Sequence, residues 1–178
     1  MALKPTIYKF DISLSDLDRN VYDTLNLTVA RHPSETLERM MARVLAYCLN
    51  ADDGLTFTKG LSEPDVPDIW ARTLDGQLVL WIDVGEPAAE RIKKATRISK
   101  SVKVYSFNSK STVWWEQAKS KYSELPVSVF RFDHSSIKIL AGLVGRTTEC
   151  SITISDGSAF VATQLGECEV AWVQLHTG

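Results

Sequence analysis

The dipeptide Asp75-Gly76 lies between two apolar stretches, and it constrains the fold of this chain more than any other feature. Asp-Gly between apolar runs is typical of a β-hairpin, because both residues tolerate positive φ angles. We therefore expect residues 69–74 and 77–84 to form antiparallel strands joined by a two-residue loop. That register places Asp68 opposite Asp83, on one face of the hairpin, with Cβ atoms roughly 5 Å apart.

Two carboxylates held so close repel each other when both are ionised. A divalent cation with oxygen ligands, Mg²⁺ or Mn²⁺, would relieve that repulsion. The hairpin therefore predicts a metal site at Asp68 and Asp83. A purely structural interpretation stays open, in which one aspartate ends a strand and the other caps a turn.

Hydrophobic periodicity predicts the elements around this hairpin. Polar and apolar residues alternate within residues 6–31, which indicates a long hairpin. Ser34 is a suitable N-cap for a helix over residues 34–49, whose apolar residues recur at helical spacing. A short strand at 55–59 then precedes the Asp-Gly hairpin.

A second helix begins near Pro87, ends near residue 99 and is followed by a buried strand at 102–107. The remaining patterns predict helices near 112–122 and 135–144 and strands at 127–132, 150–155, 159–163 and 168–174. Interleaved helices and strands predict an α/β fold with a mixed central sheet, in a single domain spanning residues 1–178.

Charge is distributed unevenly, although the net charge is only −2. Residues 51–90 contain nine acidic residues and two basic ones, whereas residues 91–103 contain six basic residues and no acidic one. A basic segment beside an acidic cluster suits a metal site that faces a phosphate ligand. The alternative is a solvated helix face that leads into a strand. The candidate nucleic-acid-binding residues in this segment are Arg91, Lys93, Arg97 and Lys100.

Helical geometry ranks further candidates. On the first helix, Glu38 lies roughly 75° from the centre of the apolar stripe and Glu35 roughly 135° from it. We therefore expect Glu38 to reach toward the sheet and Glu35 to face solvent. On the second helix, Lys94 lies roughly 105° and Lys93 roughly 155° from the buried side, so Lys94 is the better candidate to reach the carboxylates.

The three cysteines are scattered and form no zinc-binding spacing, which favours a reducing, cytoplasmic setting. Residues 1–5 lack the apolar stretch of a secretion signal. No apolar run approaches the length of about 20 residues needed to span a membrane, so we expect no membrane association.

Several segments together carry a family resemblance. Helix, three strands, helix and strand, with Pro67-Asp68 and then Asp83-Val84-Gly85, resembles the core of the PD-(D/E)xK nuclease superfamily. The chain as a whole resembles the bacterial YaeQ family, a variant of that superfamily, in the segments His32-Pro-Ser-Glu-Thr36, Phe57-Thr-Lys-Gly-Leu61, Pro67-Asp-Ile-Trp70, Leu80-Trp-Ile-Asp-Val-Gly85, Lys94-Ala95, Val104-Tyr105 and Trp114-Trp-Glu-Gln117.

The resemblance implies a restriction endonuclease-like core over approximately residues 34–107 with added C-terminal strands and helices. Asp68 and Asp83 match the two acids of the motif, and Glu38 resembles the acid contributed by the first core helix. Gly85 stands where the motif has its lysine. Lys94 resembles a migrated substitute for that lysine, and Glu86 adds a nearby oxygen ligand.

Two functions follow from this site. The first is a Mg²⁺- or Mn²⁺-dependent phosphodiesterase acting on DNA or RNA. Asp68, Asp83, Glu38 and Glu86 would hold the metal, and Lys94 would stabilise charge. The second is a non-catalytic adaptor that binds nucleic acid or protein on the same fold, with a suggested link to transcription. Gly85 favours the adaptor, whereas the grouped acids favour the enzyme. In a third interpretation the acidic pair only binds a structural cation.

Overall fold

The chain folds back on itself at its start, as a long antiparallel hairpin of β1 (Thr6–Asp16) and β2 (Val21–Arg31). The structure is a computed structural model that describes residues 4–178. Part of the segment 1–5, on which the expectation about a secretion signal depends, lies outside the described residues. Tyr8, Phe10 and Ile12 of β1 point into the core and alternate with exposed residues, as the sequence predicts.

The next elements occur in the order helix, three strands, helix, strand. They are α1 (Leu37–Leu49), β3 (Leu55–Phe57), a short 3-10 helix (Gly60–Ser62), β4 (Ile69–Arg72), β5 (Leu78–Val84), α2 (Ala89–Ile98) and β6 (Ser99–Ser106). The chain continues with α3 (Ser111–Tyr122), β7 (Ser128–Phe132), α4 (His134–Ala141), β8 (Thr147–Ser155), β9 (Ser158–Thr163) and β10 (Gly166–His176).

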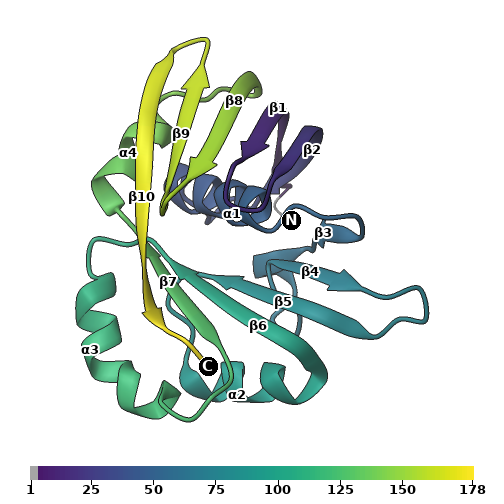
Figure 1. The fold of residues 1–178 in the computed structure, drawn as a ribbon, viewed down its shortest axis with the longest axis vertical. Helices are drawn as coiled ribbons and strands as arrows, with labels where there is room; N and C mark the ends of the chain where they lie inside the picture. Colours follow the sequence, from purple (N-terminus) through teal and green to yellow (C-terminus); the bar gives the residue numbers. More distant parts are fainter. Residues whose placement is uncertain (1–3) are drawn as a thin grey trace.

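The strands within residues 4–178 form one mixed sheet in the order β2-β1-β8-β9-β10-β7-β6-β5-β4-β3. The long strand β10 joins its two halves. Residues 166–171 pair with β9, and residues from Trp172 onward pair with β7. Figure 1 shows β10 running from the group of β1, β2, β8 and β9 to the group of β4 to β7. The fold is therefore mixed α/β, with a large, strongly bent sheet and four α-helices in the described part of the chain.

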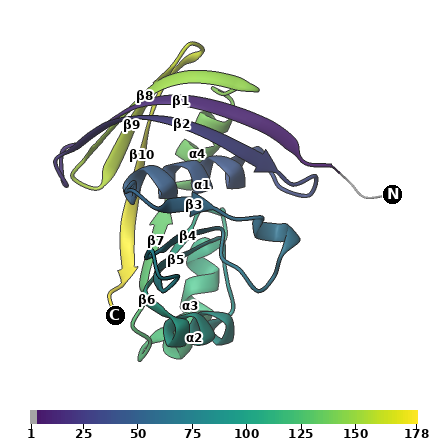
Figure 2. The ribbon, with the colours of Figure 1, turned by 90° about the vertical axis from the view of Figure 1, so that its right-hand side faces the viewer.

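Helix α1 lies inside the bend of the sheet, with strands of both halves around it (Figure 2). Its residues 40–46 are all buried, including Arg43. The sequence predicts a helix with one apolar stripe, but the two halves of the sheet bury more than one face. Helices α2 and α3 cover the group of strands β4 to β7 on the face opposite α1, where Ile92, Trp115 and Tyr122 form a second apolar cluster.

The Asp-Gly hairpin has the predicted strand register but a different turn. Ile69 pairs with Ile82, and Trp70 pairs with Trp81. The loop has three residues, 74–76, where the sequence predicts two. It is closed by a hydrogen bond from the Gly76 amide to the Thr73 carbonyl, and Gly76 has a φ of +88°. A bulge in the strand pairing between Ala71 and Arg72 compensates for the extra loop residue. The pairs farther from the turn, from Ala71 back to Ile69, therefore have the predicted alignment.

Candidate functional site

A pocket of about 440 Å³ lies where β4 begins and β5 ends, beside the start of α2. The structure brings three of the predicted acids, Asp68, Asp83 and Glu86, into its lining. Asp68 and Asp83 are only 5 % and 4 % exposed, whereas Glu86 is exposed and accepts a hydrogen bond from the Ser111 hydroxyl at 3.3 Å. The carboxylates that the hairpin register places together therefore do share one pocket.

Backbone pairing holds Asp68 in place at the entrance of β4. Its amide donates to the Ile82 carbonyl at 3.1 Å, and its carbonyl accepts from the Thr58 amide at 3.0 Å. The side-chain Oδ2 accepts from the Val84 amide at 2.8 Å, while Oδ1 accepts from Arg39 Nη2 at 2.9 Å. Both oxygens of this buried carboxylate are thus occupied by donors, one of them charged.

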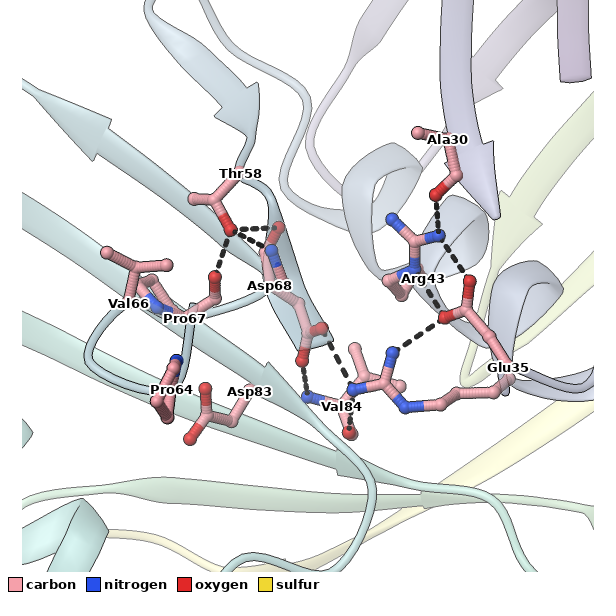
Figure 3. Close-up of polar contacts among 12 residues, drawn as sticks. Ala30, Glu35, Arg43, Thr58, Pro64, Val66, Pro67, Asp68, Asp83 and Val84 are labelled. Atoms are coloured by element: carbon pink, nitrogen blue, oxygen red, sulfur yellow. Dashed lines mark hydrogen bonds and ion pairs between the residues drawn. The ribbon is translucent and has the colours of Figure 1, made fainter. Parts of the chain in front are cut away.

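A chain of ion pairs extends from Asp68 into the core (Figure 3). Besides Asp68, Arg39 binds the Val84 carbonyl at 3.0 Å and Glu35 Oε2 at 2.7 Å. Glu35 in turn accepts two bonds from Arg43, at 2.8 and 2.6 Å, and Arg43 also donates to the Ala30 carbonyl. Alternating charges with complete hydrogen bonding are the condition under which ionised groups are tolerated in an interior.

Glu35 is therefore buried, 3 % exposed, and the expectation that it faces solvent is wrong. The helix begins two residues later than that expectation requires, because Thr36 is the N-cap and its hydroxyl accepts from the Arg39 amide. A helical angle does not apply to a residue that precedes the helix. Ser34, the predicted N-cap, lies in the turn before it.

Asp83 is paired with Arg91 from the first turn of α2. Arg91 Nε contacts Asp83 Oδ2 at 2.7 Å, and Nη2 contacts Oδ1 at 3.2 Å. The same guanidinium donates to the Val66 carbonyl at 2.8 Å and to the Pro64 carbonyl. Arg91 thus joins α2 and β5 to the loop that precedes β4.

Burial raises the pKa of Asp83 despite its contact with Arg91, and the nearby charge of Asp68 raises it further. A carboxyl with a raised folded-state pKa binds its proton more tightly in the folded protein than in the unfolded chain. Its contribution to stability is therefore lost as pH rises from its ordinary pKa through the raised value.

We expect Asp83→Asn to gain stability relative to wild type as pH rises above about 4, the ordinary pKa of an aspartate. Urea unfolding of both proteins across this range measures the difference. A difference that moves the opposite way would mean that the ion pair with Arg91 outweighs the burial of Asp83.

Two predicted residues lie outside this pocket. Glu38 is half-buried and lines a different pocket with Arg31 and Lys138, so it does not join Asp68 and Asp83. Lys94 is exposed and is not among the described residues that line the carboxylate pocket. Arg91, one turn earlier, takes the place expected for Lys94. Side chains lean toward the N-terminus of a helix, which favours the first turn of α2 for reaching the end of β5.

The other predicted bases remain at the surface. Lys93, Arg97 and Lys100 are exposed, whereas Arg91, predicted to bind nucleic acid, is half-buried in its ion pair. The sequence pattern does not predict that Glu35, Arg39 and Arg43 form a connected set. The spacing of Arg39 and Arg43 was the available signal for two bases on one side of α1, because side chains four apart on a helix are neighbours.

In the observed arrangement, the oxygen atoms of this pocket are not free to coordinate a divalent metal ion. All four carboxylate oxygens of Asp68 and Asp83, and the Val84 carbonyl, accept hydrogen bonds from nitrogen donors. Among residues 4–178 no group of three or more His, Cys, Asp or Glu side chains is arranged to hold a metal. Two guanidiniums occupy the positions where a cation would be expected.

Comparison with known proteins identifies the family. The profile described as YaeQ protein matches residues 1–172. The chain belongs to the YaeQ family. YaeQ of Salmonella typhi is 41% identical over 98% of this chain and 99% of its own, and YaeQ of Escherichia coli (strain K12) is 40% identical over the same shares. These matches confirm the resemblance to the YaeQ family.

Solved YaeQ structures share the fold over nearly the whole chain. The crystal structure of YaeQ protein from Xanthomonas axonopodis pv. citri superposes with a TM-score of 0.94 at 32% identity, covering 98% of this chain and 99% of that one. YaeQ protein from Pseudomonas syringae gives 0.92 at 35% identity, covering 98% and 97%. Within residues 4–178, no helix is long and apolar enough to cross a membrane.

Proposed function

We propose that this protein binds the phosphate backbone of nucleic acid along α2 and does not cleave it. The observation that carries the proposal is the set of exposed bases at this helix, next to a pocket whose two buried aspartates are already paired with arginines. The scaffold suits such a ligand, because the order helix, three strands, helix, strand with Asp68 and Asp83 together resembles the core of PD-(D/E)xK nucleases.

Four bases are available for phosphate contacts on and just after α2. They are Lys93, Lys94, Arg97 and Lys100, all exposed. The other two bases of the segment are engaged internally: Arg91 with Asp83, and Lys103 with the Asn50 side chain at 2.6 Å. Clustered lysine and arginine side chains supply most of the salt-dependent affinity for nucleic acids.

Several features oppose cleavage at the neighbouring pocket. Gly85 provides no cation, Lys94 is exposed and does not line the pocket, and Arg91 is committed to four hydrogen bonds. An arginine cannot act as a general base, because its pKa lies far above neutrality. These features favour the adaptor over the enzyme.

Binding can be measured by fluorescence anisotropy with labelled single-stranded DNA, duplex DNA and RNA, in the presence of EDTA. We expect wild type to bind with affinity that EDTA does not change. Replacing Lys94 and Arg97 with alanine should flatten the dependence of log K on log salt for duplex DNA by about 0.9 for each lost phosphate contact. Lys138→Ala, an exposed lysine on α4, is the matched control and should bind as wild type does. Equal binding by wild type and the double variant would refute the proposal.

A second candidate, the Mg²⁺- or Mn²⁺-dependent phosphodiesterase, is favoured by the charge of the pocket. Its described lining contains four carboxylates, Glu63, Asp68, Asp83 and Glu86, against the two guanidiniums of Arg39 and Arg91. A bound metal would supply an activated water. Degradation assays on DNA and RNA with each ion, with Asp83→Ala as control, decide between the candidates. Ion-dependent cleavage that Asp83→Ala abolishes would establish the enzyme and overturn the adaptor.

A further inference from the structure

We infer that Arg39 and Arg91 are the permanent cations of the carboxylate pocket, and that removing Arg91 converts its surroundings into a divalent-cation site. Each guanidinium fills a cage of oxygen atoms contributed by separate parts of the chain. The inference concerns the pocket alone and does not depend on nucleic-acid binding along α2.

The cage around Arg91 contains four oxygen atoms. Two belong to the Asp83 carboxylate on β5, and two are the carbonyls of Pro64 and Val66 in the loop before β4. Carboxylate and carbonyl oxygens are the ligands that Ca²⁺ prefers, and carboxylates also bind Mn²⁺. The donors of a hard-cation site are thus present, with a guanidinium at their centre.

The cage around Arg39 has the same character. Its guanidinium contacts Glu35 Oε2, Asp68 Oδ1 and the Val84 carbonyl, at 2.7, 2.9 and 3.0 Å. Three carboxylates in and beside this pocket, those of Glu35, Asp68 and Asp83, are each no more than 5 % exposed. Without cations among them, these groups would be costly to ionise.

Arginine is suited to this role because it stays charged at all relevant pH values and is less strongly hydrated than an ammonium group. A cation that belongs to the chain needs no uptake from solution, so the folded state should be indifferent to divalent ions. A simpler alternative is that Arg91 only ties the loop of residues 64–66 to α2. The two alternatives differ in whether a metal ion can replace the guanidinium.

The test is thermal melting and calorimetric titration of wild type and Arg91→Ala with EDTA, Ca²⁺ and Mn²⁺. We expect wild type to melt at one temperature in all three conditions. Arg91→Ala should melt lower in EDTA and recover part of the loss with either ion, binding Mn²⁺ at least about tenfold more tightly than wild type. Lys121→Ala, which removes an exposed base from α3, is the control and should melt and bind ions as wild type does.

Two further variants keep the result decisive. Arg91→Ala combined with Asp83→Asn should lose the recovery, because one of the carboxylate oxygens is replaced. If Arg91→Ala does not fold in EDTA, recovery of its circular dichroism signal by Ca²⁺ or Mn²⁺ supports the inference, and Arg91→Gln is titrated in the same way. No gain in ion binding by either variant would overturn it and leave Arg91 as a tie between α2 and the loop. Equal Mn²⁺ binding by wild type would also overturn it, and would favour the phosphodiesterase whatever the anisotropy experiments show.

Discussion

Glu35→Ala is expected to lower the free energy of unfolding by about 4 kcal/mol, the cost of removing one partner from a buried ion pair. Arg43 would lose both of its bonds to the carboxylate while its side chain stays only 5% exposed. Arg39 would lose one of its two carboxylate partners. For a chain of this length, the melting temperature should fall by roughly 8–16 °C.

Glu38→Ala provides the matched control, because Glu38 is half-buried and lines a different pocket. We expect it to change stability by no more than about 0.5 kcal/mol, as is usual for substitutions away from buried polar groups. Urea unfolding followed by circular dichroism measures both variants. Similar losses for the two glutamates would contradict the structure and restore the sequence-based view that Glu38 is the inward-facing acid.

Asp68→Ala should have the next largest effect, a loss of about 3 kcal/mol. The Val84 amide would be left buried with no acceptor. Arg39 would keep Glu35 but lose Asp68, the other of its two carboxylate partners. Asp83→Asn should cost far less at neutral pH, since burial already disfavours the charged form of Asp83. The two aspartates, which the hairpin register treats as equivalent, are therefore expected to differ in unfolding experiments.

A double-mutant cycle tests whether Arg39 couples the two acids. Because Glu35 and Asp68 share this guanidinium, the losses for Glu35→Ala and Asp68→Ala should not add, and we expect an interaction energy of at least about 0.5 kcal/mol. Strict additivity would mean that the two ion pairs act independently.

The Asp68–Asp83 pair could be predicted because it depends on local geometry. A hairpin register requires only a turn and two alternating strands, and the bulge near Arg72 cancelled the error in loop length. The positions of Glu38 and Lys94 could not be predicted in the same way. For Glu38, helical angles assume one buried face, but α1 lies between two halves of a bent sheet. For Lys94, the angle ignores position along α2, where Arg91 in the first turn is the base that reaches Asp83.

The sequence by itself determined the main elements, the register that places Asp68 opposite Asp83, and the family, since all of these depend on neighbouring residues or on patterns along the whole chain. Only the tertiary structure decided the charge partners. Arg39 meets Asp68 across 29 residues of sequence and the Val84 carbonyl across 45. A carboxylate in an interior takes whichever cation the packing brings within reach, because leaving it unpaired costs far more than any local preference supplies. For that reason Asp68 and Asp83, which their spacing marked as metal ligands, are bound to arginines in the folded chain.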